Sequence, residues 1–93
     1  MLDEAWTLSP SVALREEAFG ALAYHFGNRR LTFLKRRDLV QVVRALDEHR
    51  DVRSALLACG LPETSHRAYL DALRDLARTD VIRPRLSRDK EPT

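Results

Sequence analysis

The chain has few of the residues on which covalent cross-links, metal sites and catalysis depend. Its 93 residues include one cysteine, Cys59, so no internal disulfide can form. The three glycines each stand alone at expected turns, which excludes a glycine-rich phosphate loop. His25, His49 and His66 fall in different expected elements, and no two of them have the spacing of a zinc site. We therefore expect no enzymatic activity, no metal and no other cofactor.

Long apolar runs are missing too. No segment is long and apolar enough to cross a bilayer, and the acidic start MLDEAW is unlike a signal peptide. Together with the single cysteine, this favours the cytoplasm and argues against a membrane-bound protein. Hydrophobic residues form 44% and charged residues 32% of the chain, which is typical of one small globular domain.

Positive and negative charges nearly balance, but they are unevenly distributed. The 16 basic and 14 acidic residues give a net charge of +2. Residues 1–20 carry one arginine against four acids, whereas residues 28–50 carry seven lysines or arginines against three acids. This basic band could meet an acidic peptide or a nucleic acid, or its cations could simply coat solvent-facing positions.

Alternating apolar residues predict three β-strands in the first half of the chain. They cover residues 12–16, 21–26 and 29–34, with a turn at 17–20. The dipeptide Gly27-Asn28 suits a two-residue hairpin loop with glycine at its first central position. Such a loop sets the register between the second and third strands.

The expected register separates two kinds of side chain. It pairs Tyr24 with Leu31 and Leu22 with Phe33, and a slip of one residue would mix the two faces. One face carries Leu22, Tyr24, Leu31 and Phe33, and the other carries Ala23, His25, Arg30 and Thr32. Four of the six aromatic residues lie in or beside this hairpin, so we expect the sheet to anchor the core.

Helical periodicity replaces alternation after Lys35. One helix is expected over residues 37–48, and a second, short helix follows the N-cap Asp51 and ends at Gly60, with Cys59 on its apolar side. A third helix is expected over about residues 65–79, capped by Thr64 or Ser65. Three strands followed by three helices predict an α+β fold, a winged-helix-like domain with a three-stranded antiparallel sheet.

The pattern also predicts the limits of the domain. Residues 1–11 are expected to form an N-terminal arm whose Trp6 docks on the domain, because a large ring in a small protein is usually buried. The domain itself is expected over residues 12–83, and residues 84–93 form a polar, flexible tail.

Two features could bind a partner. The first is the free edge of the third strand, which offers backbone groups to an incoming strand and carries Arg30 and Thr32, with Lys35 after it. The second is the flank of the third helix, lined by Leu70, Leu73, Arg74 and Ala77. Each has an ordinary alternative: the charges could guard the edge against aggregation, and the apolar stripe of the helix could simply be wide.

Three segments, VALR, FGALAYHFG and RRLTFLK, resemble the mycofactocin branch of the PqqD-like family of RiPP recognition elements. These domains recognise ribosomal peptides that are destined for modification, and the resemblance covers roughly residues 6–85. It implies a winged-helix-like fold in which the leader of the precursor adds as a strand to the third strand, against the third helix. The implied peptide site consists of Arg30, Leu31, Thr32, Phe33, Leu34, Leu70, Leu73, Arg74 and Ala77.

The resemblance also implies partners. The bound precursor would be presented to a radical-SAM maturase, and this chain lacks the cysteine motif that such an enzyme needs for its own iron–sulfur cluster. Leaders of this kind tend to be acidic, which leads to the hypothesis that Arg30, Arg74 and Lys35 contact leader carboxylates. In this reading the chain is a peptide chaperone that binds neither nucleic acid nor membrane.

Two other readings remain open from the sequence. The second and third helices could form the helix-turn-helix of a DNA-binding winged helix. Against this, the third helix carries Asp71 and Asp75 as well as Arg67, Arg74 and Arg78, a local balance of only +1. The chain could also form a homo-oligomer in which edge strands of two copies pair.

Overall fold

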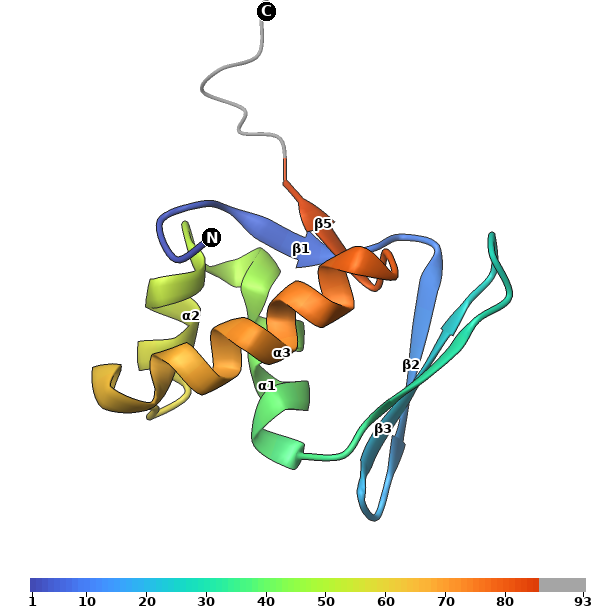
Figure 1. The fold of residues 1–93 in the computed structure, drawn as a ribbon, viewed down its shortest axis with the longest axis horizontal. Coiled ribbons are helices and arrows are strands. Elements are labelled where there is room, and N and C mark those ends of the chain that lie inside the picture. The colour runs from blue at the N-terminus through green and yellow to red at the C-terminus, as the bar shows by residue number, and fades with distance from the viewer. Residues whose placement is uncertain (86–93) are drawn as a thin grey trace, which may run out of the picture.

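The computed structural model describes residues 1–85, and its elements follow the expected order of strands and then helices (Figure 1). The larger sheet has the strand order β2-β3-β4 and is antiparallel, with bounds β2 Val12–Glu17, β3 Gly20–His25 and β4 Leu31–Leu34. The helical elements are α1 Arg37–Ala45, the 3-10 turn η1 Leu46–Glu48, α2 Val52–Ala58, the 3-10 turn η2 Glu63–Ser65, and α3 His66–Arg78. The α+β fold of a three-stranded antiparallel sheet and three helices is thus confirmed, and it is compatible with a winged helix.

Two short strands that the sequence analysis did not predict join the ends of the chain. Strand β1 (Trp6–Leu8) pairs antiparallel with β5 (Ile82–Pro84) as a separate two-stranded sheet. Beyond the pairing, Arg85 N–H donates to Ala5 O at 2.9 Å. Part of the expected arm is therefore paired with the end of the domain, and Trp6 packs against the core as expected. Residues 86–93 of the expected tail lie outside the described part of the chain.

The register of the hairpin is the expected one, but its turn is different. Leu22 lies opposite Phe33 and Tyr24 opposite Leu31. The turn spans residues 26–29 rather than Gly27-Asn28 alone, because Arg29 N–H donates to His25 O at 2.8 Å. Arg29, with a φ of 61°, occupies the left-handed region, and Gly27 does not. The prediction of a two-residue Gly27-Asn28 loop is wrong.

The imidazole of His25 accounts for this turn. Its Nδ1 accepts hydrogen bonds from the backbone N–H groups of Gly27 at 3.0 Å and Asn28 at 3.1 Å. The side chain of Asn28 in turn accepts from Arg30 N–H at 2.9 Å. These side-chain bonds satisfy three backbone donors of the turn that have no partner in the strand ladder.

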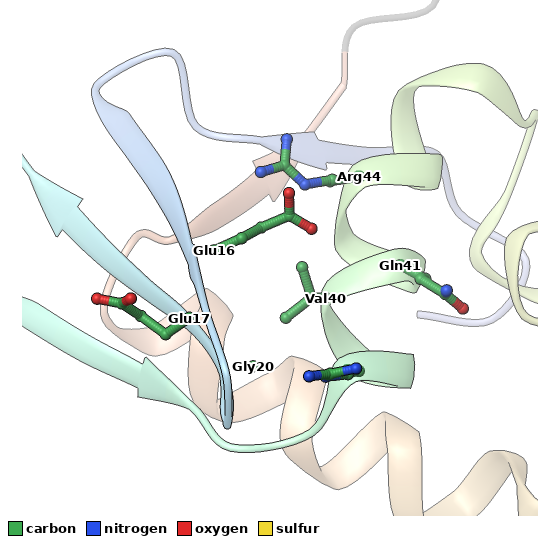
Figure 2. Close-up of a pocket in the computed structure, with 7 residues that line it drawn as sticks. Glu16, Glu17, Gly20, Val40, Gln41 and Arg44 are labelled. Carbon is green, nitrogen blue, oxygen red and sulfur yellow. The ribbon is translucent and has the colours of Figure 1, made fainter.

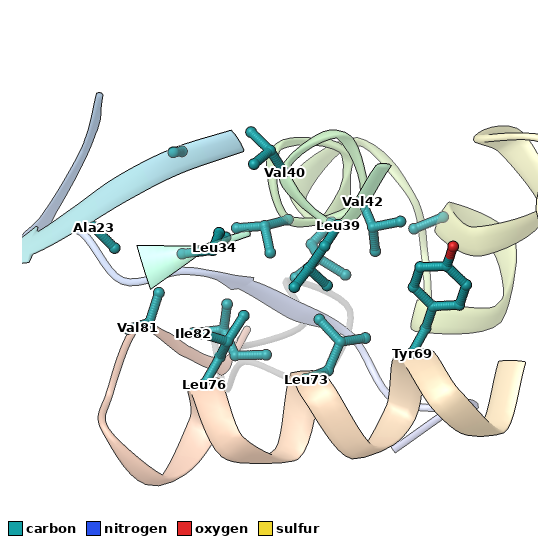
Figure 3. Packing of buried hydrophobic residues seen from close by; sticks show 14 of the residues in the cluster. Ala23, Leu34, Leu39, Val40, Val42, Tyr69, Leu73, Leu76, Val81 and Ile82 are labelled. Atoms are coloured by element: carbon teal, nitrogen blue, oxygen red, sulfur yellow. The ribbon is translucent and has the colours of Figure 1, made fainter. Parts of the chain in front are cut away.

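The core lies between the sheet, α1 and α3, and the small residues of the sheet face it (Figure 3). Ala21, Ala23 and Leu34 are at most 1% exposed and belong to the same cluster as residues of α1, α3 and β5. The aromatic face points away from the helices, with Leu31 59% and Phe33 57% exposed. The sheet does anchor the core, as expected, but through its small residues and Leu34 and not through its aromatic residues. Alanine lets helix and sheet approach closely, and the period of two sends the bulky neighbours to the other face.

The helix ends agree with the sequence in part. The Asp51 carboxylate accepts from Ser54 N–H at 2.8 Å, which confirms it as the N-cap of α2. Gly60 follows α2 with a φ of 79°, as a C-terminal glycine should. Ser65 precedes α3 but makes no capping bond, since its Oγ donates to Pro62 O at 2.8 Å instead. No helix within residues 1–85 has the length and apolar character to cross a membrane.

Replacement of Gly20 tests the junction between the sheet and α1. Gly20 has a φ of 152°, and a Cβ atom there would lie 1.9 Å from Leu34 O. We expect Gly20→Ala to lower the free energy of unfolding by about 3 kcal/mol or more, because backbone strain adds to overpacking.

Gly60→Ala is the matched control. Gly60 also has a positive φ, 79°, but nothing lies within 4 Å of an added Cβ. Its cost should be about 1 kcal/mol, the strain of a left-handed alanine alone. Urea unfolding of both variants measures the difference, and equal losses would show that the contact with Leu34 is not limiting.

Candidate functional site

The outer edge of β4 carries unpaired backbone groups. β4 is at the edge of the sheet, and His25 N–H donates to Arg30 O at 2.9 Å. Hydrogen-bonded and non-bonded pairs alternate along an antiparallel ladder, so Thr32 and Leu34 bond to β3 while Leu31 and Phe33 direct N–H and C=O outward. No other hydrogen bond within residues 1–85 uses the N–H of Leu31 or Phe33. An extended peptide could pair with both.

Two polar links join α3 and the residue pair that follows it to the segments next to β4. Close to the end of β4, the Arg36 guanidinium donates to Tyr69 Oη at 2.7 Å. Close to its start, His25 Nε2 lies 2.7 Å from Asp80 Oδ2, just beyond the end of α3. These two links fix the strand edge and the helix relative to each other, without which no ligand could use both.

Asp38 is the centre of the first link. Tyr69 Oη donates to its carboxylate, and Arg36 binds the same carboxylate through Nε at 3.2 Å and Nη2 at 2.8 Å. The guanidinium also lies 4.9 Å from the centroid of the Tyr69 ring, within cation–π range. Burial alone would raise the pKa of Asp38, but these bonds, with one from Leu39 N–H, hold it below its usual 3.8. The same bond to Asp38 raises the pKa of Tyr69.

His25 is the centre of the second link. The ring is buried, and its Nδ1 accepts two backbone bonds from the turn. Nε2 therefore carries the proton and donates to Asp80, which also accepts from Arg83 Nη2 at 2.8 Å. Hydrogen bonds from His25 and then Arg83 lower the pKa of Asp80 below its usual 3.8. One imidazole thus holds the turn and anchors it to the end of α3.

The structure brings the predicted residues of β4 together on one short strand, but with different exposure. Arg30, Leu31 and Phe33 are exposed, Thr32 is half-buried, and Leu34 is fully buried. On the open side of the sheet, Leu31 and Phe33 project from the aromatic face, whereas their backbone groups line the edge. A ligand at the edge would therefore meet main chain first.

The predicted residues of α3 also differ in exposure. Leu70 and Ala77 are half-buried and pack against the core from the side. Leu73 is fully buried, so it supports this flank from beneath rather than offering surface. Arg74 is exposed and lies 3.8 Å from Asp71 on the same helix.

The cations near the edge are mostly free. Within residues 1–85, Arg30 and Lys35 pair with no carboxylate, and neither does Arg29 in the turn. The sequence analysis did not single out Arg29 or the Arg36–Asp38–Tyr69 cluster; in the cluster, only tertiary packing brings Tyr69 near the other two residues. A strand edge with unpaired cations suits an acidic peptide.

A pocket of about 390 Å³ lies at the other edge of the sheet, between β2 and α1 (Figure 2). Its lining is Glu16, Glu17, Gly20, Arg37, Val40, Gln41 and Arg44. Glu16 and Arg44 point toward each other in Figure 2, and Arg37 donates to Ala18 O at 3.1 Å. None of the predicted site residues lines this pocket, and its mixed charges select no ligand class.

Other kinds of site find little support in the described residues. No group of three metal-ligating side chains comes together within residues 1–85. Burial raises the pKa of the Cys59 thiol, which disfavours a reactive thiolate. On α3, Asp71 and Asp75 lie beside Arg74 and Arg78, so the helix presents nearly balanced charge rather than the basic surface that DNA binding needs.

The Asp38 link predicts a pH dependence of stability. A carboxylate whose pKa is lowered in the folded state stabilises the fold above its unfolded pKa and loses that contribution as the pH falls through the folded value. We expect Asp38→Asn to lower the unfolding free energy by about 1–2 kcal/mol at pH 7. The gap from the unsubstituted protein should close as the pH falls below 3.8.

Urea unfolding between pH 7 and about pH 2.5 measures this gap. Asp71→Asn serves as the control, because it also removes an exposed carboxylate but leaves the Arg36–Asp38–Tyr69 link intact. A constant difference between Asp38→Asn and the unsubstituted protein at every pH would contradict the expectation.

Comparison with known proteins bears on the site described above. Residues 5–83 match the model of the peptide chaperone MftB family. The chain is 50% identical over 82 residues to a "Peptide chaperone MftB" of Mycobacterium ulcerans, covering 88% of this chain and 75% of that protein. It is 48% identical to the Mycolicibacterium smegmatis protein of that name, covering 88% and 80%, and 46% identical to the Mycobacterium tuberculosis one, covering 89% and 76%.

No solved structure matches the chain. The family match spans most of the described residues, including all three strands of the larger sheet and all three helices. The relatives are named for a chaperone role, which is not catalytic, in agreement with the expectation drawn from the sequence. The resemblance noted in VALR, FGALAYHFG and RRLTFLK is therefore confirmed, and the chain belongs to the MftB family of peptide chaperones.

Proposed function

We propose that this peptide chaperone binds the leader of a mycofactocin precursor by adding it as a strand to β4, and presents the precursor to a radical-SAM maturase. The observation that carries the proposal is the pair of outward, unpaired N–H groups of Leu31 and Phe33. Backbone pairing of this kind supplies affinity with little demand on side chains. The family supports a peptide ligand, and the strand edge supports the mode of binding.

The charges around the edge favour an acidic leader. Arg30 begins the segment and Lys35 ends it, so cations stand at both ends of β4 without a carboxylate partner in the described chain. Arg74 on α3 has only a distant partner on its own helix, at 3.8 Å. Such exposed cations contribute steering and modest affinity that salt should weaken.

The proposal gives α3 the role of a wall. On a helix turning 100° per residue, Leu70, Arg74 and Ala77 lie on the same side of the buried line formed by Tyr69, Leu73 and Leu76. Leu70 and Ala77 keep part of their surface free for apolar leader side chains. Leu34 and Leu73, both fully buried, keep the strand and the helix in place under the peptide.

Substitution by proline tests strand addition directly. Leu31→Pro removes an N–H that points outward and leaves the bonds to β3 intact. Proline is tolerated on an edge strand when its nitrogen faces away from the sheet. We expect affinity for a synthetic leader, measured by calorimetry, to fall at least about tenfold, the loss of one or two backbone bonds.

Leu31→Ala is the matched control, because it removes the same side chain and keeps the N–H; its affinity should stay within about threefold. Thr32→Pro should unfold the sheet, because Thr32 N–H points to β3. Equal affinities for Leu31→Pro and Leu31→Ala would rule out pairing at this edge. Circular dichroism confirms that both Leu31 variants remain folded.

Charge reversal tests the electrostatic part. Arg30→Glu and Arg74→Glu should each weaken leader binding by about three- to tenfold at low salt, and the loss should shrink as salt rises. Arg50→Glu is the control, since this exposed arginine lies between η1 and α2, outside the proposed peptide site. Unchanged affinity for both variants, or an equal loss with Arg50→Glu, would contradict a direct role for these arginines.

A further inference from the structure

The outer face of the sheet is an exposed aromatic surface. It is defined here as Phe19, Leu22, Tyr24, Phe26, Leu31 and Phe33. Phe26 is 61% exposed and Phe19 44%, in addition to Leu31 and Phe33. The rings pack only in pairs, Phe19 with Phe33 at 6.0 Å and Tyr24 with Phe26 at 5.2 Å between centroids. In the described chain the helices cover only the opposite face (Figure 1).

The size of this surface is that of an interface core. At roughly 200 Å² for each phenylalanine ring, the exposed fractions of three rings and Leu31 amount to about 400 Å². Monomeric proteins rarely leave more apolar surface than this in one place. A stable dimer buries about 800 Å² on each copy, and about 65% of a homodimer interface is apolar. The outer face with its polar border is large enough for that.

The charges on the outer face complement one another. Along β2 the outward positions hold Arg15 and Glu17, which lie 3.6 Å apart, and Lys35 continues the outward positions of β4. Glu17 and Lys35 stand at the same end of the sheet but on opposite edges. Rotation by 180° about an axis along β3 exchanges the two edges and keeps the ends together.

We propose that two copies of this chain associate through their outer faces, related by a two-fold axis parallel to β3. β2 of one copy then lies over β4 of the other. Glu17 of each copy faces Lys35 of the other copy, which gives two equivalent ion pairs. Arg15, Leu22 and Phe33 lie side by side across the three strands, so Arg15 of one copy lies over the Phe33 ring of the other. The start of β2, which lies over the turn end of the other copy, is uncharged, and Arg30 belongs to the other face of the sheet, so no like charges meet there.

Face-to-face packing of two sheets leaves the strand edges open. Backbone groups of Leu31 and Phe33 point in the plane of the sheet, whereas the interface lies above that plane. Dimerisation through the outer face therefore differs from pairing of edge strands, which would occupy the β4 edge. The proposal does not depend on peptide binding.

Analytical ultracentrifugation of the chain alone, from about 1 to 500 µM, tests the proposal at the affinities that an interface of this size allows. We expect reversible, concentration-dependent dimers. Phe19→Asp and Phe33→Asp should weaken the dimer at least about tenfold, since each buries a charge in the apolar centre. Leu57→Asp, at a leucine of α2 that is 48% exposed, should have no effect.

A charge swap identifies the second copy as the occupant. Glu17→Lys and Lys35→Glu should each weaken the dimer, and the double variant should restore it to within about threefold, because each pair is then reversed but intact. The double variant would not restore binding to a different partner protein, whose own charges are unchanged. A monomer at every concentration, dimers indifferent to Phe33→Asp, or no rescue by the double variant would each overturn the proposal.

Discussion

The close packing of two alanines against the helices is the constraint on which the rest of the structure depends. Ala21 and Ala23 are essentially inaccessible and let α1 and the end of α3 approach the sheet. Bulkier residues at these positions would push the layers apart and open cavities in a core this small. Because side chains alternate along a strand, the same packing decides that Leu22, Tyr24, Leu31 and Phe33 face away from the core.

The candidate site follows from the strand order of the sheet and from the links between β4 and α3. The order β2-β3-β4 leaves β4 at the edge, and polar links at both of its ends hold α3 alongside. His25 and Asp38 are each surrounded by hydrogen bonds rather than left as free reactive groups. Both groups hold β4 and α3 in position, in a chain that belongs to a family of peptide chaperones.

Much of the fold could be read from local patterns. The hairpin register, the three helices and the Asp51 cap are determined within short segments, where periodicity and capping chemistry act. The turn failed because the His25 ring, not Gly27, organises its backbone. The pairing of β1 with β5 was not predicted, because these strands have three residues each and lie more than seventy residues apart in the chain. The buried face of the sheet was not predicted, because the aromatic residues of the hairpin do not show that the small residues face the core.

The sequence alone determined the order of the three main strands and the three helices, the pairing within the hairpin, the family and the strand that lies at the sheet edge. These follow from side-chain period and from motifs confined to a few neighbouring residues. Tertiary structure alone decided which face of the sheet is buried, which N–H groups of β4 remain free, and which cations lack partners. Each of these depends on what residues distant in the chain cover, and packing of helices against a sheet is the step that settles it.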